Sequence, residues 1–368
     1  MAAASAFAGP IYTVADFTTP GAYSSGSSAI NSAAQIAGTS VLADGATVAF
    51  VADSSATRQL DPLGDGHSSS ASGINSAGVV AGTTYSDAGA QATLWTIAGA
   101  VGLGTLGGGD SYATDINSSG LVVGGSSTSS GATHAYAYNG AMRDLGTLAG
   151  GSWSAAYAVN SAGQVAGYGD VGGGAFRAFL WTTTGGMTQL GTLGGRSSYA
   201  MDINDDGAVA GNAQSSSGYL HAFLHSSGRM QDLGTLGGTS SFAYDVNNLG
   251  QVVGYSYLAG LDVTHAFLYS GGIMQDLNSL IAGDSGWILT EAYGINDAGQ
   301  IAGTGLFNGE QRAFSLDLAS VVGGTGRMTL MSTDTPLIHN PEPGPLSLIA
   351  LGVGFLMLPR LIRKLRKG

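Results

Sequence analysis

Ile116-Asn117-Ser118-Ser119-Gly120-Leu121-Val122-Val123-Gly124 is one of seven copies of the pattern I/V-N-x-x-x-x-I/V-x-G. The other copies span residues 30–38, 74–82, 159–167, 203–211, 246–254 and 295–303. Successive copies begin 44, 42, 43, 44, 43 and 49 residues apart, and a period of this length is typical of a four-stranded propeller blade. The chain has 368 residues, more than one compact core usually supports, so the repeats favour a repeat architecture over unrelated domains.

Each repeat predicts four strands. The stretch before the asparagine, as in residues 111–116, alternates like a half-buried strand, and N-x-x-G supplies a tight return. A short aromatic strand follows, with His-Ala-Phe at residues 221–223 and 265–267, and a strand such as 142–148 completes the unit. Small residues three positions before the Ile or Val fit a crowded innermost strand: Ser27, Ala71, Ala113, Ala156, Ala200, Ala243 and Ala292.

The phase of the repeats predicts how a ring would close. Residues 11–17 occupy the place of a fourth strand, whereas the last repeat stops after its third strand, at residues 313–316. The N-terminal strand can therefore supply the missing one and leave no open edge. We expect an all-β fold, a seven-bladed propeller of four-stranded blades over residues 11–320, with an open β solenoid as the alternative.

Both ends of the chain carry processing signals. Residues 1–10, MAAASAFAGP, have small residues at the spacing that signal peptidases accept, which predicts a signal-peptide remnant; a disordered N-terminus is the alternative. After a linker at residues 321–340, Pro341-Glu342-Pro343 precedes an apolar run at 346–358, which predicts a short transmembrane helix. The basic end should stay cytoplasmic and contains Arg360, Arg363, Lys364, Arg366 and Lys367.

This tail, residues 341–368, resembles the PEP-CTERM sorting signal of Gram-negative bacteria in its motif, length and position. The resemblance implies an inner-membrane-anchored precursor, processing by an exosortase, and a mature protein at the cell surface or in the extracellular matrix. An ordinary tail anchor would keep the helix and the basic end but has no need of Pro-Glu-Pro.

The repeats resemble those of the bacterial extracellular HAF-repeat family, named for His-Ala-Phe. The companion G-x-M-x-D-L-G-T-L-G-G is matched at residues 228–238, and the resemblance covers about residues 11–316. The first and last repeats depart from it, which leaves their boundaries open. The resemblance implies export and a surface role, and it defines no biochemical activity.

Charge and composition exclude several classes of function. The net charge is −12, and five of the 12 basic residues lie among the last nine positions, so the body is strongly acidic. Nucleic-acid binding normally needs a basic face, and we therefore expect none. Cysteine is absent, which excludes disulfides, thiolate metal sites and a cysteine nucleophile.

The candidate sites have simpler interpretations. Asp202, Asn204 and Asp206 match the start of a calcium loop, but its twelfth position is Ala213, so an Asx-stabilised turn is favoured and calcium is the alternative. His134, His221 and His265 recur at one repeat position, one or more blades apart, which favours a structural role over zinc. The sequence marks out no carboxylate pair for glycoside chemistry.

The sequence thus predicts an exported, noncatalytic propeller that is structural or binds a ligand, without a cofactor other than the calcium alternative. An extracellular polysaccharide is a candidate partner. Trp95, Trp153 and Trp181 could stack on sugars, although aromatic residues at repeat-equivalent positions more often lie in the core. The alternative function is a polysaccharide-active hydrolase or lyase.

Overall fold

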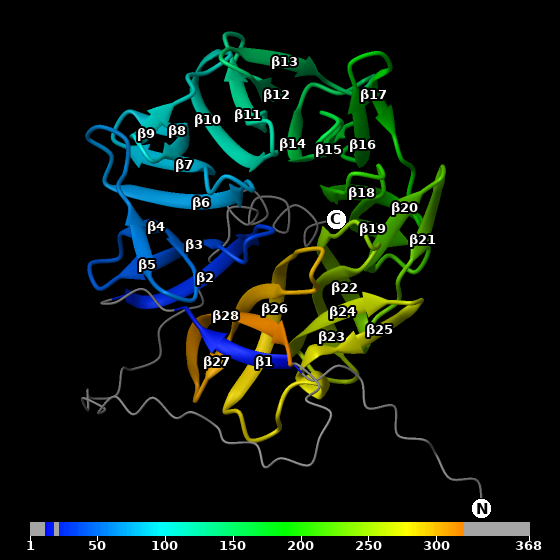
Figure 1. Cartoon of the computed structure of the whole chain (residues 1–368). Helices are drawn as coiled ribbons and strands as arrows, with labels where there is room; N and C mark the ends of the chain where they lie inside the picture. Colours follow the sequence, from blue (N-terminus) through cyan, green and yellow to red (C-terminus); the bar gives the residue numbers. More distant parts are fainter. Residues whose placement is uncertain (1–11, 18–21, 320–368) are drawn as a thin grey trace, which may run out of the picture. The chain divides into compact units, whose positions relative to one another are not determined.

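The computed structural model describes residues 12–17 and 22–319. These residues form seven four-stranded antiparallel sheets arranged as blades around a central axis (Figure 1). The predicted seven-bladed propeller of four-stranded blades is confirmed. The predicted signal-peptide remnant at 1–10, the linker at 321–340 and the tail at 341–368 with its hydrophobic helix lie outside the described residues. In the part that is described, no helix is long and apolar enough to span a membrane.

In blades 1 to 6, strand order follows the chain from the axis outward (Figure 1). Blade 1 consists of β2 (Ala22–Ile30), β3 (Ile36–Leu42), β4 (Thr47–Ala52) and β5 (Thr57–Leu60). Blade 2 consists of β6 (Ser68–Ile74), β7 (Val80–Ser86), β8 (Gly89–Thr96) and β9 (Gly99–Gly102). Blade 3 consists of β10 (Gly107–Ile116), β11 (Val122–Thr128), β12 (Thr133–Tyr138) and β13 (Met142–Gly146). Blade 4 consists of β14 (Ser154–Val159), β15 (Val165–Asp170), β16 (Phe176–Thr182) and β17 (Gly186–Gln189).

The remaining blades include one insertion and the closing strand. Blade 5 consists of β18 (Gly194–Ile203), β19 (Val209–Ser215), β20 (Leu220–Ser226) and β21 (Arg229–Asp232). Blade 6 consists of β22 (Gly237–Val246), β23 (Val252–Leu258), β24 (Thr264–Ser270) and β25 (Ile273–Asp276). Blade 7 consists of β26 (Trp287–Ile295), β27 (Ile301–Phe307), β28 (Glu310–Leu318) and β1 (Tyr12–Asp16). A 3₁₀ turn, η1 (Leu277–Leu280), lies between blades 6 and 7, where the repeat spacing lengthens to 49 residues.

The N-terminal strand closes the ring as predicted. β1 pairs antiparallel with β28, from Tyr12 opposite Leu318 to Asp16 opposite Phe314. This register places Asp16 opposite Phe314 in the same way that Asp232 of blade 5 lies opposite Phe223. Arg312 of β28 adds an ion pair to Asp16 at 3.1 Å. The N-terminal strand therefore pairs as the fourth strand of blade 7, and its Asp16 occupies the same position as the aspartate in the fourth strand of blade 5.

The repeated glycine that ends the motif is required by a bulge in every inner strand. Each inner strand slips in register against the second strand just before the Ile-Asn or Val-Asn pair, as between Ala113 and Asp115. A Cβ on Gly124 would lie 2.0 Å from the Tyr112 carbonyl oxygen, and one on Gly254 would lie 1.9 Å from that of Phe242. Since no side chain fits at such distances, only glycine allows the two strands to approach.

The hydrophobic core is divided into layers between neighbouring blades. One cluster joins Val123 of blade 3 to Phe179 of blade 4, and another joins Ala302 of blade 7 to Phe50 of blade 1. The small residues predicted on the innermost strands are all buried. Because each blade buries its faces against two neighbours, the blades depend on the closed ring for their stability.

Candidate functional site

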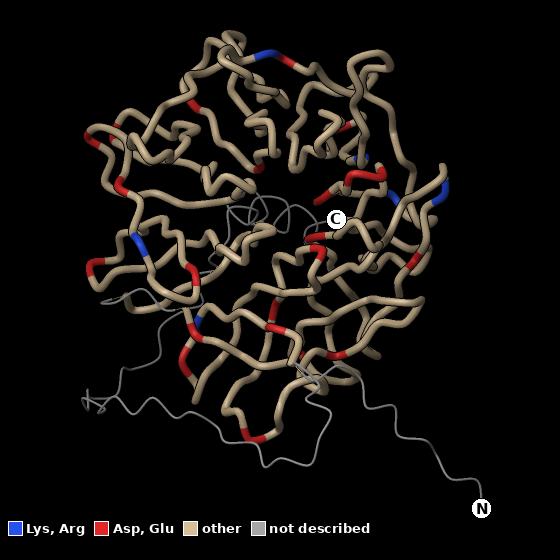
Figure 2. Tube along the Cα trace, in the orientation of Figure 1, with Lys and Arg blue, Asp and Glu red and all other residues tan. Residues whose placement is uncertain are grey.

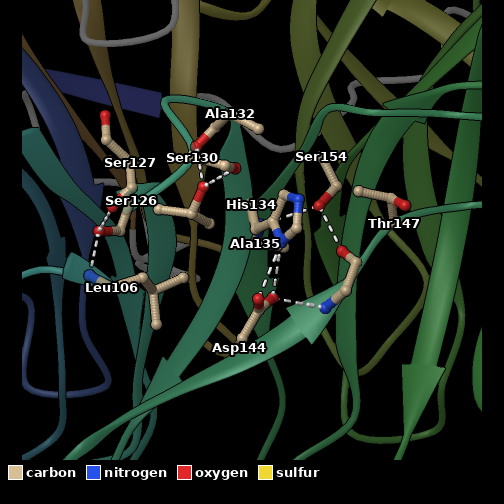
Figure 3. Close-up of polar contacts among 12 residues, drawn as sticks. Leu106, Ser126, Ser127, Ser130, Ala132, His134, Ala135, Asp144, Thr147 and Ser154 are labelled. Atoms are coloured by element: carbon tan, nitrogen blue, oxygen red, sulfur yellow. Dashed lines mark hydrogen bonds and ion pairs between the residues drawn. The ribbon is translucent and has the colours of Figure 1, made fainter. Parts of the chain in front are cut away.

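The histidine of the third strand, which contains His-Ala-Tyr in blade 3 and His-Ala-Phe in blades 5 and 6, pairs with the Asp of the fourth strand (Figure 3). His134 Nδ1 lies 2.8 Å from Asp144 Oδ2, and Asp144 Oδ1 accepts a hydrogen bond from the Gly146 amide at 2.7 Å. The same histidine and aspartate positions meet at 2.8 Å in blade 5 and at 2.7 Å in blade 6. Each histidine thus bonds to the strand beside it, as the sequence predicted.

The alanine of the motif links one blade to the next. The Ala135 amide donates to Ser154 Oγ of blade 4 at 2.8 Å, and that hydroxyl donates to the Gly146 carbonyl of blade 3 at 2.6 Å (Figure 3). The corresponding serine, Ser241, makes both contacts between blades 5 and 6. One serine on each of these inner strands therefore satisfies two backbone groups of the preceding blade.

Ser154, His134 and Asp144 have the side-chain types of a hydrolase triad, but they do not form its hydrogen bonds. A nucleophilic serine needs a base that accepts its proton and a path for substrate. Ser154 is fully buried, and its hydroxyl donates to the Gly146 carbonyl instead of the imidazole. The arrangement recurs in blades 5 and 6, which fits a cross-link between blades better than a catalytic centre.

Seven asparagines, one from each repeat motif, form a closed ring of hydrogen bonds around the axis. The Nδ2 group of each donates to the backbone carbonyl of the next, at distances from 2.9 to 3.3 Å, and Asn296 donates to Asn31 at 3.0 Å to complete the circle. All seven are buried: Asn31, Asn75, Asn117, Asn160, Asn204, Asn247 and Asn296. The side-chain oxygen of each also accepts from amides of its own turn, as Asn117 does from Leu121 at 3.0 Å. We call the end of the propeller that carries these turns the asparagine face.

Three carboxyl groups on the inner strands lie just before this ring, and sequence reasoning missed their role. Asp115, Asp202 and Asp245 accept backbone amides of a following blade, at 2.8 Å from Val159, 2.8 Å from Val246 and 2.7 Å from Ile295. The available signal was an Asp before Ile or Val in repeats three, five and six. Acidic residues accordingly lie around the centre of the propeller as well as at its edge (Figure 2).

These carboxyl groups hold protons more tightly than usual. Burial, together with the nearby Asp202, raises the pKa of Asp115 to about 7. Burial also raises the pKa of Asp202 and of Asp245, whose carboxyls hydrogen-bond to each other. This is the behaviour expected of two close carboxyls that share a proton.

The predicted calcium ligands have other partners. Asp202 binds the Val246 amide, Asn204 Oδ1 accepts from the Ala208 amide at 2.9 Å, and Asp206 is exposed. The Asx-stabilised turn is therefore present, and calcium at this loop stays a prediction. Within residues 12–17 and 22–319, no group of three or more His, Asp or Glu side chains is placed to hold a metal ion.

An aromatic cluster lies toward the opposite end, which we call the loop face because it carries the connections between blades. Trp153 lies 5.3 Å from Tyr168 and 6.0 Å from Phe176, measured between ring centroids, and Phe176 stacks on Tyr199 at 6.0 Å. Trp153, Phe176 and Tyr199 stay partly exposed, whereas Tyr168 is buried beneath them. We call these four residues the Trp153 cluster.

The other two tryptophans considered from the sequence belong to the core. Trp95 is 3% exposed, with its indole N–H donating to the Asp61 carbonyl at 2.7 Å. Trp181 is 7% exposed and lies under the guanidinium of Arg143 at 5.1 Å. Of the three, only Trp153 retains a surface that a ligand could reach.

Comparison with known proteins agrees with the architecture. The chain is similar to a puromycin-hydrolyzing peptidase from Mycobacterium tuberculosis, with a TM-score of 0.52 and 11% identity over 80% of this chain and 52% of the peptidase. It is similar to a puromycin hydrolase with a TM-score of 0.51 and 13% identity, over 79% of this chain and 52% of that enzyme. The body is a β-propeller. The propeller spans about half the length of these two enzymes, so the likeness concerns the fold alone.

Other comparisons add no activity. The β-propeller domain of the Trilobed protease from Pyrococcus furiosus gives a TM-score of 0.49 and 10% identity, over 80% of this chain and 94% of that domain. A family described as "Protein of unknown function (DUF3466)" matches residues 187–339 of the propeller and the following segment, which is less than half of the chain. No curated protein matches the sequence significantly.

Proposed function

We propose that this protein is an exported, noncatalytic propeller that binds a polysaccharide of the cell surface or extracellular matrix through the Trp153 cluster. The observation that carries this proposal is the partial exposure of Trp153, Phe176 and Tyr199 at the loop face, whereas Trp95 and Trp181 lie in the core. Flat aromatic rings provide apolar area with little loss of conformational entropy, which suits sugar rings.

The surroundings of the cluster supply polar groups for such a ligand. Arg196 and Arg177 lie on the same face, where the Arg196 guanidinium donates to the Gly173 carbonyl and Arg177 donates to the Arg196 carbonyl. Asp170 accepts the amides of Ser152 and Trp153 at 2.7 Å each, which fixes the backbone that carries the indole. A rigid aromatic surface beside guanidinium groups suits an uncharged or acidic glycan.

The test measures binding and polymer length together on a panel of polysaccharides. We expect retention of at least one polymer with unchanged size distribution, and loss of retention in W153A. Y23A is the matched control, because Tyr23 is 70% exposed on blade 1, away from the cluster. Shortened polymer would favour the hydrolase or lyase alternative, and equal binding by W153A would exclude this surface.

Export through the tail is a separate part of the proposal. It rests on Pro341-Glu342-Pro343 and on the basic end of the chain. Intact mass and C-terminal peptide mapping of protein from native cells and medium would test it. A mature form that ends near Pro343 is expected after exosortase cleavage, whereas a retained basic end in both fractions would indicate an ordinary membrane anchor.

A further inference from the structure

Glu291 is a carboxylate in an unusual place on the propeller axis. It lies on inner strand β26, four positions before Ile295, where the other repeats carry Gly26, Ser70, Tyr112, Ala155, Tyr199 and Phe242. The side chain is only partly exposed, and burial raises its pKa. Removing a carboxylate from water is costly unless a partner compensates for it.

Tyrosines from three strands surround this carboxylate. Tyr293 of β26 donates its hydroxyl hydrogen bond to Glu291 Oε2. The Tyr244 ring of β22 lies 4.7 Å from that of Tyr293 and 5.7 Å from that of Tyr255 of β23. Burial raises the pKa of the Tyr244 and Tyr255 phenols, and the nearby Glu291 adds to the increase. Tyr244 and Tyr293 remain partly exposed, so their rings and the carboxylate share an accessible surface.

No positive charge of the propeller neutralises this group. The ion pairs of residues 12–17 and 22–319 involve Asp16, Asp144, Asp232, Asp276 and Glu310, and none involves Glu291. A ligand on this surface therefore meets an acidic, aromatic environment, which complements a positive charge and disfavours an anion.

The aromatic residues of blade 4 show that packing of the blades does not need the carboxylate. In blade 4, Tyr157 occupies the position of Tyr293 and stacks on Tyr168 at 4.9 Å, with a hydroxyl-to-hydroxyl distance of 2.9 Å. Ala155 stands there in the place of Glu291. The tyrosine arrangement thus forms without a carboxylate, and Glu291 adds charge to it.

We propose that Glu291 and the two partly exposed tyrosines beside it, Tyr244 and Tyr293, form a binding site for a small organic cation, a quaternary or protonated alkylamine. The carboxylate supplies the compensating charge, and the tyrosine faces supply cation–π attraction. The site lies between blades 6 and 7, apart from the Trp153 cluster, and does not depend on polysaccharide binding.

The experiment titrates the full chain with tetramethylammonium chloride and follows the heat of binding and tyrosine fluorescence. We expect saturable binding that weakens about tenfold or more in E291Q, because the charge attraction is lost while the side chain keeps its size. A neutral analogue, tert-butanol, should bind much more weakly than tetramethylammonium, and sodium chloride at the same ionic strength should not compete as a ligand.

Two further variants separate a binding role from a folding role. Y293F keeps the ring but removes the hydroxyl that bonds to Glu291, and we expect it to retain most of the affinity. E291D keeps the negative charge on a shorter side chain, and we expect it to bind tetramethylammonium more tightly than E291Q does. Equal binding by wild type and E291Q, equal binding of tert-butanol, or no saturable binding by the folded wild-type chain would each overturn the proposal.

Discussion

The asparagine ring can be tested with a substitution that changes one atom of the side chain. Asn117 Nδ2 donates to the Asn160 carbonyl at 2.9 Å, while Asn117 Oδ1 accepts from the amides of Ser119 and Leu121 at 3.1 and 3.0 Å. Asn117→Asp keeps the two turn contacts but puts an oxygen where the donor was. An unsatisfied buried carbonyl, together with the repulsion of an added charge, should cost about 2–4 kcal/mol of unfolding free energy at pH 7.

The matched control is Ser118→Asp, which adds the same charge at the exposed neighbouring position, where blade 5 naturally has Asp205. Urea unfolding of wild type and both variants at pH 7 and pH 4 measures the difference. The loss in N117D should shrink at pH 4, because a protonated carboxyl can again donate to the Asn160 carbonyl. If N117D and S118D unfold at the same urea concentration at pH 7, the hydrogen bond of the asparagine ring does not stabilise the fold by this amount.

Three other perturbations address closure, charge and the repeated histidine. Deleting residues 1–17 removes β1 and exposes the edge of β28, so the melting temperature should fall by several degrees and the protein should self-associate; an unchanged melting temperature would contradict closure by this strand. The folded pKa of Asp115, about 7, exceeds the ordinary 3.8, so the fold is more stable when this carboxyl is protonated. The unfolding free energy should therefore fall by up to about 4 kcal/mol as the pH rises from 4 to 7. D115N should make the unfolding free energy depend less on pH over this range. His221→Ala should cost only about 1 kcal/mol, because the side chains of the His221–Asp232 pair are 21% and 41% exposed; a cost above 3 kcal/mol in denaturant unfolding would indicate a larger role.

The repeat pattern was sufficient to predict the fold because its period, strand content and phase each constrain the same architecture. Seven copies of one motif gave seven blades, and the displaced fourth strand at residues 11–17 gave the closure that β1 makes with β28. The small residues of the motif were predicted to lie on a crowded inner strand, but the bulge beside Gly124 was not predicted. A bulge breaks the two-residue alternation of a strand, and a single sequence does not show where that occurs.

The candidate sites were harder to predict because they depend on neighbours that are distant in sequence. Asp115 reaches the Val159 amide, 44 residues along the chain, and Glu291 meets Tyr244 from the preceding blade. Trp95, Trp153 and Trp181 looked alike as sequence features, yet only packing between blades distinguishes the exposed one from the two buried ones. The Ser154, His134 and Asp144 set shows the reverse case, in which familiar residue types serve to hold blades together.

The asparagine ring also means that the propeller has no first blade. Every asparagine donates a hydrogen bond to the asparagine of the next blade. Asn296 of the last blade donates to Asn31 of the first, although the two are 265 residues apart in the chain. The break between chain ends is therefore one of seven nearly equivalent places at which the same circle could be cut. A circular permutant that joins residues 319 and 12 through a flexible linker and opens at the turn after β13 should form the same ring. An added eighth repeat would have to form these hydrogen bonds with the blades on both of its sides.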